Sequence, residues 1–142
     1  MARGAVIADT ELTRQATAYR NLYLQADSYL LHLFVNDHSP TVGDTLASYT
    51  ECTTAGYAPQ VIPPAAWTVA PPVAHAVLIV QTNPRRFVPD STAVPVLIYG
   101  YFVSDELGRF AWAEAFTIPQ LFTPGNFIDV RAKYRFANCP MP

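Results

Sequence analysis

The sequence is poor in charge. Charged residues make up 14% of its 142 residues, against about 25% in average proteins, and there is a single lysine, Lys133. The net charge is −2, and the densest basic groupings are Arg85–Arg86 and residues 131–135. Because nucleic-acid-binding surfaces need many cations facing the phosphates, we predict no nucleic-acid partner. Hydrophobic residues make up 51%, a composition that suits a surface partly covered by neighbouring proteins.

Cysteine and long apolar runs are also scarce. Cys52 and Cys139 are the two cysteines, and the chain has no CxxC pair, so no zinc site is expected. We expect two free, buried thiols, and a disulfide between them stays open as the alternative. No apolar run reaches the roughly 18 residues of a membrane span. Residues 1–8 are too short for the apolar core of a signal peptide and precede Asp9. No membrane partner is predicted.

Motifs of catalysis are missing as well. The chain has no phosphate-binding glycine loop, no dinucleotide fingerprint, no H-E-x-x-H and no G-x-S-x-G. The histidines, His32, His38 and His75, stand apart. We expect His32 to be a hydrogen-bonded core or rim residue and His38 a solvated turn residue. The sequence therefore predicts no catalytic, cofactor-binding or metal-binding residues, no cofactor, and a protein that is not an enzyme.

Two alternative sites rest on acids and tyrosines. Glu51 and Glu114 lie beside aromatic residues in expected strands, as the carboxylates of a glycosidase would, but their separation is not readable from sequence. Tyr99 and Tyr101 fall on one face of an expected strand, where they could stack on sugars. Alternating aromatic residues in strands more often belong to the core than to a sugar-binding surface. The glycosidase and the sugar-binding alternatives therefore both rank below a structural role.

Proline limits where helices can form. All thirteen prolines lie after residue 39, which excludes a long helix in that part of the chain. Before it, apolar and aromatic residues recur at i, i+4, i+7 and i+11 from Leu12 to Tyr23. This spacing predicts one helix over residues 10–24.

The remainder of the chain is predicted to form short strands. Apolar runs or alternation predict them at residues 30–35, 76–81, 94–103, 109–117 and 128–136. Both faces of 94–103 are apolar, so this strand is expected to be central, and Gly100 predicts a bulge or a close neighbour there. Asp105 and Glu106 are expected at a hairpin tip, with carboxylates that point apart.

The stretch between residues 56 and 74 contains five prolines. It is expected to be extended, with any strand short or at a sheet edge, and Trp67 is expected to anchor it to the core. Short strands with frequent turns predict a mostly β fold, an antiparallel β-sandwich of jelly-roll type with one N-terminal helix. We predict a single domain over residues 1–142, with short arms at 1–9 and 137–142.

Several segments resemble a group of small virion structural proteins of tailed bacteriophages. In order, they are LHLFVNDHSPT at 31–41, DTLASYTE at 44–51, GYA at 56–58, Trp67, and IYGYFVSD at 98–105 followed by WAE at 112–114. The resemblance spans roughly residues 10–137. It carries over no catalytic residues, and the prolines at 59–72 and Cys52 are particular to this chain.

The resemblance implies a structural role and a location in the virion. Within a virion, the expectation is a capsid decoration (cement) protein that binds between major capsid subunits and itself forms a homo-oligomer. A tail or head–tail connector component is the first alternative, and a carbohydrate-binding or receptor-binding module is the second.

Overall fold

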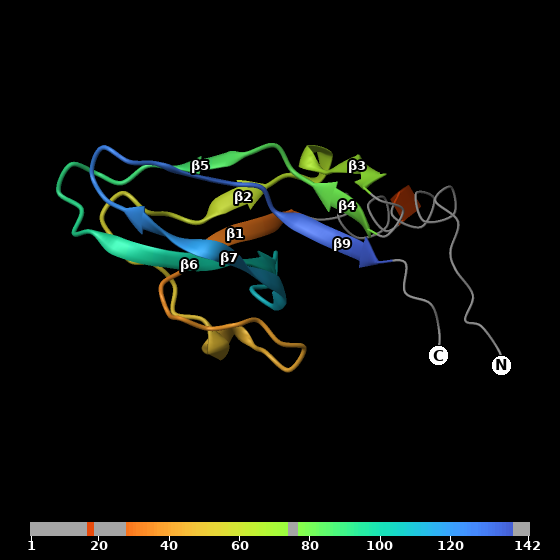
Figure 1. Cartoon of the computed structure of the whole chain (residues 1–142), viewed down its shortest axis with the longest axis horizontal. Helices are drawn as coiled ribbons and strands as arrows, with labels where there is room; N and C mark the ends of the chain where they lie inside the picture. Colours follow the sequence, from red (N-terminus) through yellow and green to blue (C-terminus); the bar gives the residue numbers. More distant parts are fainter. Residues whose placement is uncertain (1–16, 19–27, 74–76, 138–142) are drawn as a thin grey trace.

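The computed structural model of the protein describes residues 17–18, 28–73 and 77–137 (Figure 1). These residues are mostly antiparallel strands with almost no helix, which confirms the predicted β class. The predicted helix at 10–24 lies outside the described residues except for 17 and 18, and these two do not establish it. The expected arms at 1–9 and 137–142 also lie outside them, apart from Ala137.

A four-stranded antiparallel sheet forms the body of the molecule. In spatial order its strands are β2 (Gln60–Ile62), β1 (Tyr29–Phe34), β6 (Val96–Asp105) and β7 (Phe110–Phe122). The strand predicted to be central, β6, lies between β1 and β7. The predicted hairpin joins β6 to β7, and its turn is closed by the Gly108 amide, which donates to the carbonyl of Asp105 at 3.0 Å.

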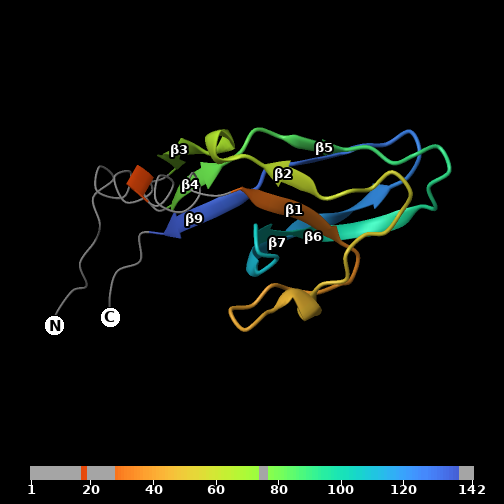
Figure 2. The ribbon, with the colours of Figure 1, turned by 180° about the vertical axis from the view of Figure 1, so that it is seen from behind.

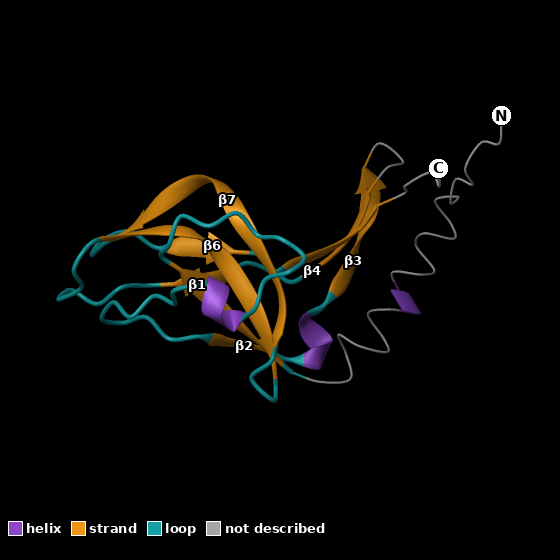
Figure 3. Ribbon diagram, turned by 90° about the horizontal axis from the view of Figure 1, so that it is seen from below, coloured by secondary structure: helices purple, strands orange, loops and turns teal. Residues whose placement is uncertain are grey.

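Two smaller sheets complete the fold. One contains β3 (Thr68–Val73), β4 (Val77–Gln81) and β9 (Lys133–Ala137), and the other pairs β5 (Arg85–Phe87) with β8 (Ile128–Val130). Figure 3 shows β3 extending away from the four-stranded sheet. Single 3₁₀ turns lie at η2 (Leu46–Ser48) and η3 (Pro64–Ala66).

The strand predicted over 128–136 is divided between these two sheets. Its first part, β8, pairs with β5, and its second part, β9, pairs with β4. The prediction of one continuous strand was wrong. Apolar and polar residues keep alternating between Val130 and Lys133, where the chain passes from one sheet to the other, and Ala132 in this break is fully buried. The sequence pattern therefore gives no sign of the break. The strand β5 was not predicted, because its basic residues carry no apolar pattern.

Hydrophobic clusters pack on both faces of the four-stranded sheet. The main cluster joins residues of β1 and β6 to Phe87 of β5 and Ile128 of β8, so the β5–β8 pair covers one face. The second cluster is centred on Phe34, Tyr49 and Phe102. Tyr49 belongs to the loop after β1, and Figures 1 and 2 place this loop on the opposite side of the sheet from β5.

Gly100 marks a change of register in β6, as predicted. Ile98 is opposite Gln120, whereas Gly100 is opposite Ala115, so β7 has extra residues at this point. The prediction that Tyr99 and Tyr101 share a face was wrong, because the irregularity reverses the alternation. Tyr101 packs in the main cluster and Tyr99 against the second one.

The strand β7 continues beyond its predicted end at 117, through Pro119, to Phe122. Residues 116–119 lie outside its ladder with β6, and β7 is the last strand of its sheet. Proline is tolerated in such a strand because an edge position does not need its missing N–H.

The proline-rich stretch behaves as predicted. Its strands β2 and β3 are six residues or fewer and each lies at the end of its sheet. Trp67 between them is 1% exposed and belongs to the main cluster. Its ring centroid lies 5.7 Å from that of Trp112, which confirms that Trp67 anchors this segment to the core.

Candidate functional site

His32 lies on β1, on the face that carries the second cluster. Its Nδ1 is 2.7 Å from Oε1 of Glu51 and its Nε2 is 2.7 Å from Oγ of Ser104. The ring stacks on Phe102, with centroids 4.4 Å apart and planes nearly parallel. Both ring nitrogens are therefore satisfied, and the predicted hydrogen-bonded core or rim histidine is confirmed.

Tyr57 completes this polar cluster. Its hydroxyl donates to Oε1 of Glu51 at 2.8 Å and accepts the amide of Leu33 at 3.0 Å. Burial and the neighbouring Glu51 carboxylate raise the pKa of Tyr57 above its usual value. The cluster ties the loop after β1 back to β1 itself, because Glu51 also forms a β-bridge with Phe34.

The order Ser104–His32–Glu51 is that of a hydrolytic triad, in which the histidine links the serine to a carboxylate. Ser104 was not singled out from the sequence, because its partner lies 72 residues away along the chain. A nucleophilic serine also needs nearby N–H groups for the oxyanion. Ser104 is 3% exposed, and the adjacent amide of Asp105 already donates to the carbonyl of Arg109. The geometry therefore favours a structural cluster.

A second polar cluster shapes the same loop. The carboxylate of Asp44 accepts hydrogen bonds from the hydroxyl of Tyr49 at 2.6 Å and the amide of Thr41 at 2.9 Å, and it pairs with His38 Nε2 at 2.8 Å. These bonds, that of Tyr49 foremost, hold the pKa of Asp44 well below its usual range. His38 lies in a loop and is 31% exposed, so it is partly solvated as expected, but its pairing with Asp44 and its packing against Tyr49 were not predicted.

This cluster predicts sensitivity to acid. Because the pKa of Asp44 is lower in the folded chain than the value of about 3.9 in unfolded chains, ionised Asp44 stabilises the fold above that value, and this contribution is lost as the pH falls toward the folded pKa. We expect the Asp44→Asn variant to have a lower urea midpoint than the wild type at pH 7. The difference between the two midpoints should become smaller as the pH is lowered from 5 to 2.

The control is Asp37→Asn, which removes a charge from an exposed position in the same loop. Its midpoint should follow that of the wild type at every pH. A constant gap between Asp44→Asn and the wild type across this range would contradict the assignment.

Glu51 and Glu114, the two acids weighed as a catalytic pair, lie on opposite faces of the four-stranded sheet. Glu51 lies with His32 beside the second cluster, whereas Glu114 is opposite Tyr101, with 3.5 Å between Glu114 Oε2 and the tyrosine hydroxyl, on the main-cluster face. The carboxylate of Asp105 accepts hydrogen bonds from the backbone amides of Arg109 and Leu107 and from Nε of Arg109. These bonds, that of the Arg109 amide foremost, lower the pKa of Asp105.

The other predicted groups have separate places in the structure. The carboxylate of Glu106 accepts a hydrogen bond from the backbone amide of Ser28 and does not share a site with that of Asp105. Arg86 forms two hydrogen bonds with Asp129, at 2.9 and 3.0 Å. Cys52 is a buried free thiol, and both Cys139 and His75 lie outside the described residues. The Tyr99–Tyr101 platform does not form, because these side chains face opposite sides of the sheet.

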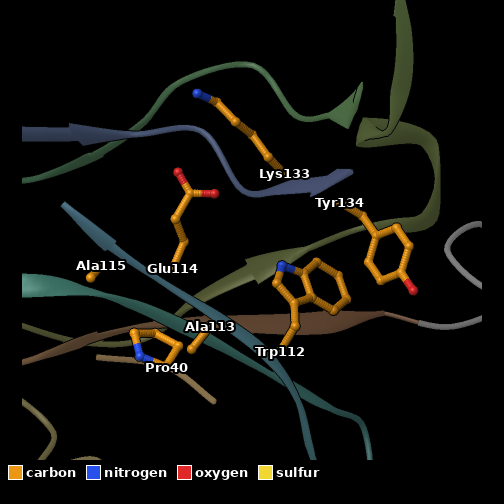
Figure 4. Close-up of a pocket in the computed structure, with 7 residues that line it drawn as sticks. All are labelled: Pro40, Trp112, Ala113, Glu114, Ala115, Lys133 and Tyr134. Atoms are coloured by element: carbon orange, nitrogen blue, oxygen red, sulfur yellow. The ribbon is translucent and has the colours of Figure 1, made fainter. Parts of the chain in front are cut away.

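A hollow in the described surface runs along β7 (Figure 4). Its volume is about 510 Å³, and Trp112, Ala113, Glu114 and Ala115 of β7 line it together with Pro40 on one side and Lys133 and Tyr134 on the other. A neighbouring hollow of about 480 Å³ shares four of these residues and continues to Phe110 and Val42. The two form one groove, which we call the β7 groove.

Strand-edge backbone distinguishes the β7 groove from an ordinary pocket. Six consecutive residues of β7, Phe110–Ala115, line it, and β7 pairs with β6 on its other side. No described strand pairs with its outer edge. Such an edge presents backbone N–H and C=O groups to any chain that lies beside it. Sequence analysis missed the groove because its walls come from distant parts of the chain.

Other kinds of site have less support. Within the described parts of the chain, no group of three or more His, Cys, Asp or Glu side chains is gathered closely enough to hold a metal ion. No helix among the described residues combines the length and apolar character needed to cross a membrane. Comparison with protein-family models, curated proteins and solved structures finds no match to this chain.

Proposed function

We propose that this chain is a structural protein of a tailed-bacteriophage virion, and specifically a capsid decoration (cement) protein that binds between major capsid subunits. The observation that carries the proposal is the contrast between its polar clusters and its hollows. The described polar clusters direct their hydrogen bonds to their own members, and His32, Glu51 and Ser104 line only a small hollow of about 260 Å³. The β7 groove is lined by a strand edge and by mostly apolar and aromatic side chains, with Glu114 and Lys133 among them. This arrangement favours binding to other proteins over catalysis.

Exposed apolar side chains support the same role. Leu97 and Leu121 face each other across β6 and β7 and are 44% and 47% exposed. Further exposed large apolar residues among those described are Val42, Leu46, Val61, Val88, Val94, Leu107, Ile118 and Phe127. Burying such groups between shell subunits stabilises the assembled shell, since a protein that binds only the assembled state shifts the equilibrium toward it. Because the chain has few charged residues, association with a partner has to remove water from fewer charged groups, and the free-energy cost of desolvation is lower.

The finer features of the fold belong to the same proposal. A main cluster between the four-stranded sheet and the β5–β8 pair supports a jelly-roll-like β-sandwich. Homo-oligomerisation would multiply weak contacts to a repeating shell. Nucleic acid and membrane are not part of the proposed mechanism, and no cofactor is needed.

Copy number in the purified particle tests this role. We expect quantitative mass spectrometry to find the chain at parity with the major capsid protein, or at a simple fraction of it. A low count that matches a ring or a fibre would instead assign the chain to the tail or the head–tail connector. Absence from the particle would overturn the structural proposal.

A further inference from the structure

The hollow of about 260 Å³ on the second-cluster face is lined by His32, Glu51 and Ser104 together with apolar and aromatic residues. We infer that this hollow binds a lysine side chain of a partner protein, whose ammonium group donates to the carboxylate of Glu51. The inference goes beyond the proposed function, because it names the chemistry of one contact and holds whether or not the partner is a capsid subunit.

Most of the lining of the hollow is apolar or aromatic. Tyr49 and Phe102 are buried, and their rings stack with centroids 5.4 Å apart. Leu30 is half-buried and Leu46 is exposed, and both also line the hollow. An unbranched aliphatic chain can therefore enter the hollow and contact apolar groups along its length, as the stems of lysine side chains commonly do on apolar surfaces.

Glu51 supplies a carboxylate oxygen for the ligand. Its Oε1 accepts the hydroxyl of Tyr57 at 2.8 Å and lies 2.7 Å from Nδ1 of His32. Its Oε2 has no hydrogen-bond partner among the described residues, and the Glu51 side chain is 37% exposed. One oxygen thus fixes the orientation of the carboxylate, and the other can accept a hydrogen bond from a ligand in the hollow.

The charges around the hollow favour a cation. Gly108 of the β6–β7 hairpin tip lines the hollow, and the same tip carries Asp105 and Glu106. Arg109 pairs with Asp105, at 2.7 Å, whereas no lysine or arginine of the described residues pairs with Glu51. A positively charged group that approaches the hollow therefore meets complementary negative charge.

The geometry selects lysine over arginine. A guanidinium group binds a carboxylate best through two parallel hydrogen bonds, one to each oxygen, but Oε1 of Glu51 already has two partners. An ammonium group acts as a point charge and needs only Oε2. The single lysine of this chain, Lys133, is half-buried and lines the β7 groove, so the lysine in the hollow comes from a different protein.

Titration of the full-length chain with the capped tripeptide acetyl-Ala-Lys-Ala-amide tests the inference. We expect the backbone amide resonances of Leu46 and Gly108 to shift and saturate in NMR spectra, with a Kd on the order of 1 mM for so small a ligand. The matched tripeptide with norleucine in place of lysine lacks the ammonium group. It should bind at least about tenfold more weakly, because hydrogen bonds to charged groups are worth more than that factor.

Substitutions then locate the site. Glu51→Gln keeps an acceptor at Oε1 for His32 and Tyr57 and removes the charge, so it should weaken binding of the lysine tripeptide at least about tenfold. The matched control is Glu106→Gln, which removes a charge from the adjacent hairpin tip but does not line the hollow, and it should bind as the wild type does. Leu46→Ser leaves the Glu51 cluster intact and should also weaken binding, because the lysine stem loses an apolar contact. Circular dichroism of each variant checks that the fold is retained.

Three results would overturn the inference. They are the lack of a saturable shift with the lysine tripeptide, equal binding of the lysine and norleucine tripeptides, and equal binding by Glu51→Gln and Glu106→Gln. Tighter binding of the corresponding arginine tripeptide would contradict the choice of lysine. Binding of n-butylamine without binding of the lysine tripeptide would assign the hollow to a free amine and would contradict a partner protein. None of these results bears on copy number in a virion, so the proposed function is tested separately.

Discussion

Replacing Trp67 by alanine is expected to lower the free energy of unfolding by about 3–5 kcal/mol, the usual range for removing a buried large aromatic side chain. Trp67 is 1% exposed and is among the largest fully buried side chains. It packs edge-on against Tyr29, with ring centroids 6.3 Å apart, and against Trp112. Because domains are commonly stable by only about 5–15 kcal/mol, this substitution should remove a large part of the total.

The measurement is urea unfolding followed by far-UV circular dichroism. Trp67→Phe is the matched control, because it keeps an aromatic ring in the same place. The indole N–H of Trp67 is buried and finds no acceptor among the described residues, so phenylalanine sacrifices no hydrogen bond. We expect Trp67→Phe to retain most of the stability. A loss below about 1 kcal/mol in Trp67→Ala would contradict the anchoring role, since large losses are tied to buried core positions.

Replacing Gly100 by alanine should cost about 1–3 kcal/mol, the range for adding atoms to a packed core. A Cβ at this position would clash with the backbone carbonyl oxygen of Glu114 and would lie 2.6 Å from Cζ of Phe34. The phenylalanine ring could shift, but the carbonyl belongs to the paired strand β7 and cannot move without disturbing the ladder. The β6–β7 pairing should therefore weaken.

Gly43→Ala provides the control, because a Cβ at Gly43 would meet nothing within 4 Å. Its effect on the urea midpoint should lie within about 0.5 kcal/mol, as for most surface substitutions. The crowding seen at Gly100 would be refuted if the two alanine variants had equal midpoints. A larger loss in Gly100→Ala would also show that the β6–β7 pairing contributes to global stability.

Local features of the fold were predictable from the sequence. The thirteen prolines excluded long helices after residue 39, and their density around Trp67 placed short strands at sheet edges. The turn residues before Arg109 indicated the hairpin, and Gly100 indicated the irregularity in β6. Each of these inferences depends on backbone geometry that a few adjacent residues impose.

The candidate sites were less predictable. His32 was expected to be satisfied, but Ser104 and Glu51 could not be identified as its partners. The pairing of the partly exposed His38 with Asp44 was not foreseen either. Each partner is chosen by how the loop after β1 folds over the sheet. The β7 groove was missed because Pro40 and Tyr134, which flank it, are far apart in the chain.

The sequence by itself determined that the chain forms short antiparallel strands, since alternation, proline and turn residues act over a few positions. Only the tertiary structure decided which strands pair, how 128–136 divides between two sheets, and which face Tyr99 and Tyr101 each occupy. Strand β1 pairs with β6, for example, through residues about 70 positions apart. Such pairings depend on the packing of the whole core, because many registers satisfy the same local pattern and only one buries all the apolar faces together.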